Sequence, residues 1–221
     1  MNRFVGLALV FGLFANGGVP AQASEYPDKP LRMIIGFTPG GGLDILARII
    51  SEQLGKQLGT QIVVDNRPGA GTTLAVGLAA RAPADGYTLL MVNNSFTINP
   101  NLYSRVPYDP IKDFAPIAKV ASAPFLVVVH PSLPADSIRE LLALARAKPG
   151  QLNYSTGGNG STGHLAGELL KSMTGVQIQH VPYKGAAPAL AGLLNGSVDI
   201  MMGSLPSASA FVKSGQLRAL A

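Results

Sequence analysis

The sequence contains no cysteine among its 221 residues. This absence excludes disulfide bonds, thiolate metal sites and a cysteine nucleophile. Apolar residues make up 47% of the chain, which is enough to build a hydrophobic core. We therefore expect a protein that is held together by its core and is long enough for one large domain or two smaller ones.

Histidine is also scarce, and the three that occur lie far apart at His130, His164 and His180. Their spacing forms no metal-ligand pattern with nearby carboxylates, so we expect no metal. The sequence has no G-x-S-x-G motif, and its loop serines have no recognisable base and orienting acid beside them. We expect no catalytic residue and assign the serine hydroxyls to hydrogen bonding.

Nucleotide motifs are incomplete. No Gly-Lys-Ser/Thr follows the strand that ends near Gly36, which excludes a P-loop. Residues 158–163 match G-x-G-x-x-G, but the next strand, near 177–183, carries no acidic residue for a ribose. A helix N-terminus that binds a smaller anion is the better interpretation, and we expect no cofactor.

The net charge is only +5, and the basic residues are scattered singly rather than in a stripe with aromatic residues between them. This pattern disfavours nucleic-acid binding and suits a small anionic ligand.

The N-terminus has the pattern of an export signal. A charged start with Arg3 is followed by an apolar run over residues 4–15 and by Ala21-Gln22-Ala23, a small-residue cleavage motif. We expect cleavage before Ser24. The apolar run is shorter than the ~20 residues that a membrane-spanning helix needs, so we expect a soluble exported protein.

The rest of the chain repeats one unit, in which an apolar strand leads through a glycine-rich or polar loop into a helix. Continuous apolar strands separated by helices predict an α/β fold with sheets covered on both faces. A polar, proline-rich stretch over 99–110 interrupts the pattern, and strands near 114–120 and 125–130 follow it. We expect two βαβ lobes, over residues 24–124 and 125–221, after a signal peptide over 1–23.

The most informative unit joins the strand over 32–37 to three glycines, Gly40 to Gly42, and then to an amphipathic helix. Glycine allows a sharp turn and a close approach to a ligand, and the helix directs its free amides and positive dipole end at that point. This order predicts an anion site. A strand-to-helix turn without a ligand remains the alternative.

Motifs along the whole mature chain resemble those of the Bug-type substrate-binding proteins of tripartite tricarboxylate transporters. They lie in the same order and at similar spacing, at residues 26–30, 38–44, 65–71, 85–90, 107–110, 160–166, 180–185 and 215–221. The resemblance implies a type II periplasmic-binding-protein-like fold with a ligand cleft between two lobes. It also implies a periplasmic protein, a monomer, that closes on a small tricarboxylate, dicarboxylate or related acid and delivers it to membrane permease subunits.

Carried onto this chain, the resemblance places ligand contacts in loops of both lobes, mainly through backbone amides and hydroxyls. The expected ligand-binding residues are Phe37, Thr38, Gly40, Gly41, Gly42, Asp44, Asn93 and Ser95 in the first lobe, with Ser155, Thr156, Gly160, Ser161, His164, Tyr183 and Lys184 in the second. From the residues alone, Asp44 could instead cap its helix.

Members of the resembled family continue beyond the last apolar run of this chain, over 217–221. The resemblance therefore implies that the first lobe is incomplete here, with exposed apolar surface, weak or absent ligand binding and a tendency to aggregate. Two other functions stay open at this point. They are an exported hydrolase that uses Ser161 with His164, and a ligand-binding sensor module without a permease.

Overall fold

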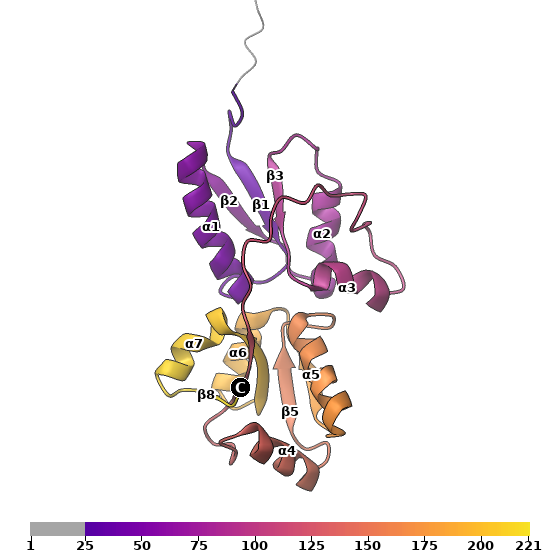
Figure 1. The fold of residues 1–221 in the computed structure, drawn as a ribbon, viewed down its shortest axis with the longest axis vertical. Helices are drawn as coiled ribbons and strands as arrows, with labels where there is room; N and C mark the ends of the chain where they lie inside the picture. Colours follow the sequence, from indigo (N-terminus) through magenta and orange to yellow (C-terminus); the bar gives the residue numbers. More distant parts are fainter. Residues whose placement is uncertain (1–24) are drawn as a thin grey trace, which may run out of the picture.

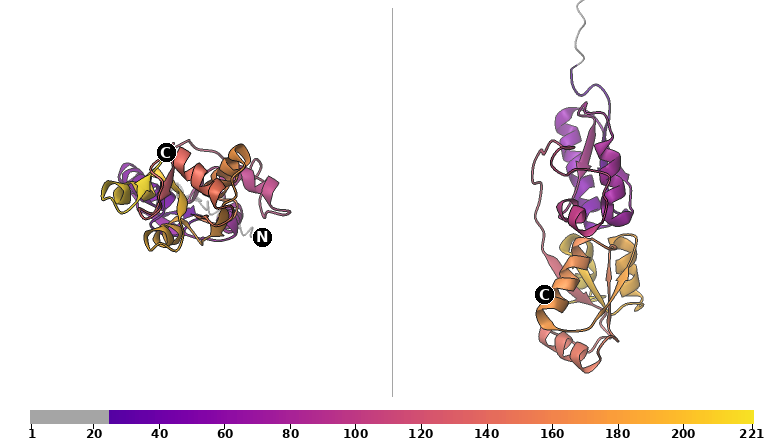
Figure 2. Two further views of the ribbon diagram at one scale, coloured as in Figure 1. Left: turned by 90° about the horizontal axis from the view of Figure 1, so that it is seen from below. Right: turned by 90° about the vertical axis from the view of Figure 1, so that its right-hand side faces the viewer.

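The computed structural model describes residues 25–221; the expected signal peptide lies outside the described residues. Two sheets organise this part of the chain (Figure 1). We call the three-stranded sheet, ordered β2-β1-β3, and its helices the first lobe. The five-stranded sheet, ordered β6-β5-β7-β4-β8, and its helices form the second lobe. Figure 2 shows the lobes stacked along the long axis of the molecule, joined by one connecting segment on its side.

The first lobe alternates strands and helices. Its strands are parallel, with Ile35 opposite Asn66 in β2 and Met91 in β3, so all three end at the same edge. The elements are β1 (Leu31–Ile35), α1 (Gly42–Leu58), β2 (Ile62–Asn66), the short 3-10 helix η1 (Ala70–Thr72), α2 (Thr73–Ala80), β3 (Thr88–Met91) and α3 (Ser95–Leu102).

Helix α1 follows the three glycines, as the sequence predicts. Gly41 is its N-cap, and the helix ends at Gly59, a left-handed C-cap whose N–H donates to the Gly55 carbonyl. Buried Ala47 and the flanking leucines of α1 pack on Leu31, Met33 and Ile35 of β1. Helix α2 contacts β1 as well.

Two sequence expectations for the first lobe were wrong. Helix α3 occupies part of the stretch expected to be an irregular connection, with Pro100 inside the helix. Conversely, the strand expected near 114–120 does not form, because none of the described strands pairs with this segment. Residues 115–124 instead run as exposed, irregular chain from the first lobe to β4, and Ile117 is 83% exposed.

The second lobe has a mixed sheet, whereas the βαβ pattern in the sequence predicts parallel strands. β5 is parallel to β6 and β7, whereas β4 is antiparallel to both β7 and β8. The elements are β4 (Phe125–Val129), α4 (Ile138–Ala147), β5 (Asn153–Thr156), α5 (Thr162–Thr174), β6 (Gln179–Pro182), α6 (Ala186–Leu194), β7 (Ile200–Ser204), α7 (Leu205–Lys213) and β8 (Arg218–Ala219).

Apolar clusters fill both faces of the second sheet. Ile200 and Met202 belong to one cluster, and Met201, which lies between them, belongs to the other. Successive strand residues point to opposite faces, so α4 and α5 cover one face and α6 and α7 cover the other. Ser137 caps α4 and Ser161 caps α5, each accepting a backbone N–H three residues ahead.

The carboxyl ends of β1 and β5 point toward each other across the boundary between the lobes (Figure 1). The loops that follow these strands therefore meet, which is where open α/β sheets bind ligands. Of the helices over 25–221, none has the length and apolar character to cross a membrane.

Candidate functional site

The loops of the first lobe contact the N-terminal ends of three helices of the second lobe. Thr38 packs against Gly185, which precedes α6, and Gly42 packs against Ser204, which precedes α7. The loop before α5 contacts the first lobe at Gly71 and Asn99 through Asn159 and Gly160. We call this boundary the interlobe site.

Glycines allow this close approach. A Cβ on Gly42 would lie 2.2 Å from the Ser204 hydroxyl oxygen, and one on Gly160 would lie 2.6 Å from Oδ1 of Asn99. A Cβ on Gly185 would lie 2.0 Å from the Thr38 hydroxyl oxygen. Side chains at these positions would hold the lobes apart.

Two hydrogen bonds cross the interlobe site. Nδ2 of Asn93, at the end of β3, donates to the Thr162 hydroxyl at the start of α5 over 3.2 Å. The Tyr103 hydroxyl donates to the Asn159 carbonyl over 3.0 Å. Asn93 follows β3 and Tyr103 follows α3, and their partners lie in the loop before α5 and at the first residue of that helix, so both bonds link the first lobe to the start of α5.

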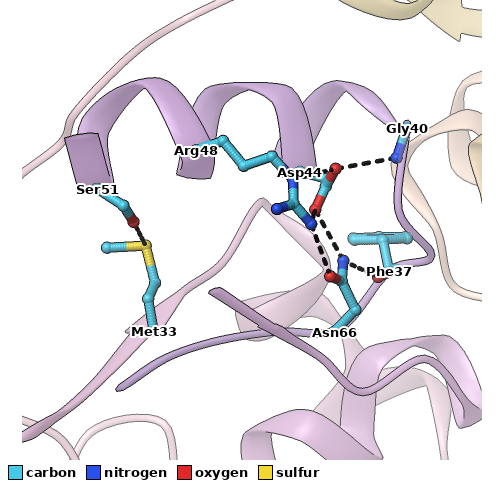
Figure 3. Close-up of polar contacts among 7 residues, drawn as sticks. All are labelled: Met33, Phe37, Gly40, Asp44, Arg48, Ser51 and Asn66. Atoms are coloured by element: carbon cyan, nitrogen blue, oxygen red, sulfur yellow. Dashed lines mark hydrogen bonds and ion pairs between the residues drawn. The ribbon is translucent and has the colours of Figure 1, made fainter. Parts of the chain in front are cut away.

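The glycine-rich loop after β1 is braced by Asp44 (Figure 3). Its carboxylate is 3% exposed and accepts hydrogen bonds from the Gly40 N–H at 2.9 Å, from Arg48 at 3.0 Å and from Nδ2 of Asn66 at 2.9 Å. Asn66 also donates to the carbonyl of Phe37 over 2.9 Å. The carboxylate is therefore occupied by the protein's own donors, and Asp44 and Asn66 fix the shape of the loop.

Burial of the Asp44 carboxyl would raise its pKa, but the hydrogen bonds from Arg48, Gly40 and Asn66 and the charge of Arg48 outweigh burial and lower it. The group is thus ionised at neutral pH. An ionised Asp44 in the first turn also interacts favourably with the dipole of α1.

A second polar network shapes the loop after β5. The Thr156 hydroxyl lies 2.6 Å from Nε2 of His180 and accepts the Gly158 N–H at 3.2 Å. The Ser161 hydroxyl accepts the His164 N–H, and Nδ1 of His164 accepts the Gly160 N–H, each over 3.3 Å. These bonds hold the backbone of 156–161 in place opposite Asn99.

The imidazole rings of His164 and His180 stack with their centroids 4.3 Å apart. His180 also contacts the Tyr154 ring, with a distance of 5.0 Å between the centroids. Burial is the main cause that lowers the pKa of His180 to about 4; the charges of His164 and Lys171 act in the same direction, and that of Glu168 opposes them. His180 is therefore neutral at pH 7 and pairs with Thr156 in that form.

Three buried side-chain polar atoms have no hydrogen-bond partner within residues 25–221: the hydroxyl oxygens of Thr38 and Ser95 and Oδ1 of Asn99. Thr38 and Asn99 contact the second lobe directly, at Gly185 and Gly160. A buried polar atom without a partner costs about 1–3 kcal/mol, so close approach of the lobes is unfavourable unless another molecule supplies partners.

The structure brings most of the expected site residues to the interlobe site, but three lie differently. The Ser155 hydroxyl is buried and donates to the Ala189 carbonyl of α6 over 3.1 Å, inside the second lobe. The Tyr183 ring packs against Gly192 of α6, and Lys184 is exposed. The side chains of Thr156 and Asp44 brace their loops, as described above. A ligand role for all of these residues remains a prediction.

Sequence reasoning missed Asn99, Tyr103, Thr162, Gly185 and Ser204, which all lie at the interlobe site. Asn99 and Tyr103 were missed because Pro100 led the sequence analysis to predict an irregular connection where α3 forms. The signal that could have located Asn99 is its spacing from Ser95, since residues four apart share one helix face.

The chemistry of the site favours binding. The described residues contain no group of three or more His, Cys, Asp or Glu side chains that could hold a metal. The Ser161 hydroxyl accepts a backbone N–H, and in the described chain no hydrogen bond connects it to an imidazole, as a hydrolase would need.

Residues 46–221 match the sequence profile of the family described as "Tripartite tricarboxylate transporter family receptor". The curated protein BugT of Bordetella pertussis is 36% identical over 223 residues, which cover all of this chain and 68% of BugT. This family is one of receptors, not of enzymes, so the hydrolase alternative is not supported.

Two solved structures are similar in fold. Rpa4515 of R. palustris, determined with adipate, is 39% identical with a TM-score of 0.87. MatC from Rhodopseudomonas palustris, determined with bound malate, is 31% identical with a TM-score of 0.82. The matches cover 89% and 88% of this chain but only 66% and 67% of those chains. The chain thus spans about two thirds of the length of these relatives.

Proposed function

This chain belongs to the tripartite tricarboxylate transporter receptor family, and we propose that it captures a small carboxylate between its lobes and delivers it to the membrane subunits of such a transporter. Proteins of this family are periplasmic receptors. For this chain, the periplasmic location and the signal peptide cleaved before Ser24 are part of the proposal. So are the lobe boundaries, 24–124 and 125–221, and the monomeric state.

One observation carries the proposal: helix N-termini from both lobes face each other. The start of α1 at Gly42 contacts Ser204 at the start of α7, and Gly40 and Gly41 lie close to Ala187 and Ala186 of α6. Each N-terminus carries free N–H groups and the positive end of a helix dipole. Positive ends that approach one another are stabilised when an anion lies between them, and a carboxylate fits this need.

The unpartnered hydroxyls of Thr38 and Ser95 add to this support. Each can donate a hydrogen bond to a carboxylate oxygen without giving up an existing one. A carboxylate therefore removes part of the cost of bringing the lobes together, which couples binding to closure.

The ligand class follows from the relatives. Rpa4515 was determined with adipate and MatC with malate, so two family structures contain dicarboxylates of different length. We propose a dicarboxylate, tricarboxylate or related organic acid. The residues proposed to contact it are Phe37, Thr38, Gly40, Gly41, Gly42, Asn93 and Ser95 of the first lobe and Gly160, Ser161 and His164 of the second.

Isothermal titration calorimetry of the chain with succinate, malate, adipate and citrate tests the proposal. The resemblance alone implied weak or absent binding, whereas the facing loops and the free hydroxyls lead us to expect at least one acid to bind at micromolar concentration, with no turnover of the acid. Small-angle X-ray scattering should show a smaller radius of gyration when that acid is present. Absence of binding by all four acids would contradict the proposed function.

Adjacent glycines offer a matched test of closure. Gly42→Ala would place a Cβ 2.2 Å from the Ser204 hydroxyl, whereas a Cβ on Gly41 would lie 3.4 Å from Ala186, an ordinary contact. We expect Gly42→Ala to weaken binding about tenfold. Gly41→Ala should leave it nearly unchanged, because alanine keeps the backbone N–H through which residue 41 is proposed to contact the ligand. Adding Ser204→Ala to Gly42→Ala removes the obstructing oxygen and should restore most of the affinity. Equal effects of the two single variants would mean that the lobes do not close at this contact.

A further inference from the structure

Asn99 has an amide whose orientation is fixed. Nδ2 donates to the Gly71 carbonyl, which only the NH₂ side of the amide can do. Oδ1 therefore points the other way, toward Gly160 of the second lobe, where a Cβ would lie 2.6 Å from it. The side chain is fully buried, and Oδ1 has no hydrogen-bond partner within the described residues.

An amide oxygen can only accept hydrogen bonds, so a carboxylate cannot satisfy Oδ1 of Asn99. The hydroxyls of Thr38 and Ser95 differ, because each can donate to a carboxylate. Oδ1 of Asn99, at the same interlobe site, can instead be satisfied by a ligand group that carries an N–H or O–H. We propose that Asn99 is a specificity-determining residue that selects carboxylates bearing a hydroxyl or amino group; this inference rests on the proposed function.

The position of that donor on the ligand follows from helix geometry. Ser95 and Asn99 lie four residues apart in α3, so their side chains share one face of the helix, one turn apart. Both are fully buried. Because both atoms lie on this face, the proposal has one end of the ligand meet both residues, with a carboxylate oxygen at Ser95 and the donor group on the adjacent carbon at Oδ1 of Asn99. The preferred ligand is thus a 2-hydroxy or 2-amino dicarboxylate.

Ligand analogues test this inference on the unaltered chain. Malate, aspartate and 2-methylsuccinate differ only in whether the 2-substituent is a hydroxyl, an amino group or a methyl of similar size. The 2-substituted adipates give the same series at a longer chain length. In the series whose chain length fits the site, we expect the 2-hydroxy or 2-amino ligand to bind at least about tenfold more tightly than its 2-methyl analogue. The methyl group cannot donate a hydrogen bond and leaves Oδ1 of Asn99 unpaired.

Two variants assign the preference to Asn99. Asn99→Leu has a similar shape without the acceptor, and the ratio of the two dissociation constants should fall to about one. Ser95→Ala is the matched control on the same helix face: it should weaken all ligands alike and preserve the ratio. If Asn99→Leu does not fold, the analogue series on the unaltered chain still decides.

The outcomes separate the two proposals. Equal affinity for the methyl and hydroxy or amino analogues, or a ratio that survives Asn99→Leu, overturns the inference while the carboxylate receptor stands. Failure of every acid to bind at both chain lengths overturns the receptor proposal and this inference with it.

Discussion

The two lobes present similar loops to each other but stabilise them in different ways. In the second lobe, apolar clusters fill both faces of a five-stranded sheet, and Ile200 and Met201 are almost fully buried on opposite faces. In the first lobe, one cluster packs beneath α1, and the glycine-rich loop depends on the buried Asp44 carboxylate. Ile111 and Ile117, near the connection to the second lobe, are more than 80% exposed.

This difference indicates which loop is easier to disturb. The loops of the second lobe rest on a sheet that apolar packing holds from both sides. The loop after β1 rests on a smaller sheet and on a few charged hydrogen bonds. We therefore expect local changes in the first lobe to affect the site through polar contacts, and changes in the second lobe to act through its core.

The largest effect is expected from equal deletions in the two cores. Ile200→Ala and Ile35→Ala each remove the same atoms from a fully buried position, in β7 and β1 respectively. Each variant should lower the free energy of unfolding by about 2–5 kcal/mol. Because one irregular segment joins the lobes, we expect two transitions in differential scanning calorimetry. Ile35→Ala should lower the transition of the first lobe and Ile200→Ala that of the second. A single transition lowered by both variants would show that the lobes unfold as one unit.

An intermediate effect is expected from Asp44→Asn. The change removes the charge that accepts hydrogen bonds from Gly40 and Arg48, at a cost of about 1.5–3 kcal/mol for a charged hydrogen-bond network. Chemical denaturation monitored by circular dichroism measures this loss in the free energy of unfolding. Because folding lowers the pKa of Asp44, its contribution is present above the ordinary carboxyl pKa and disappears as the pH falls through the lowered value.

Glu52→Gln is the matched control for Asp44→Asn. It breaks the ion pair with Lys56 on the same helix, but both side chains are 63% exposed. Such a surface pair contributes little, so no measurable change in stability is expected. A loss as large as that of Asp44→Asn would mean that charge along α1, rather than bracing of the loop, stabilises the first lobe.

The effect that is smallest at neutral pH concerns the response of the second lobe to acid. Folding lowers the pKa of His180 from its ordinary value near 6.5 to about 4, so the unfolded chain takes up a proton first as the pH falls. Stability from this group is complete above pH 6.5 and is lost between 6.5 and 4, with a slope of at most about 1.4 kcal/mol per pH unit. His180→Gln should flatten thermal unfolding curves in this range, while Gln can still pair with Thr156.

The pH slopes of the unaltered chain and of His180→Gln should coincide above pH 7, which serves as the internal control. An unchanged slope between pH 4 and 6.5 would mean that the imidazole is not desolvated in the folded protein.

Much of the fold could be predicted because its signals are local. The apolar strand before the glycines predicted β1, and the apolar spacing after them predicted α1. Ser137 and Ser161 cap α4 and α5 through hydroxyls that accept backbone N–H groups three residues away, which is another interaction between residues close in the chain. The mixed second sheet was not predictable, since the direction of β4 depends on which distant strand it pairs with.

Local signals also misled. Pro100 suggested a loop, but it lies within α3, which packs close to η1 and α2. Phe114 and the apolar residues after it suggested a strand, but a strand forms only where another strand pairs with it. In both cases, tertiary contacts decided the local structure.

The sequence by itself determined the α/β class, the glycine turn that opens α1 and the family resemblance, because these depend on residue order and on short-range spacing. Only the tertiary structure decided which polar atoms at the interlobe site stay free. Asp44 is satisfied because Gly40, Arg48 and Asn66 converge on it. Oδ1 of Asn99 is unpaired because Gly71 takes its amide N–H and none of the described segments brings a donor to its oxygen. Pairing of a buried polar atom depends on segments that are distant in the chain, and folding alone brings those segments together.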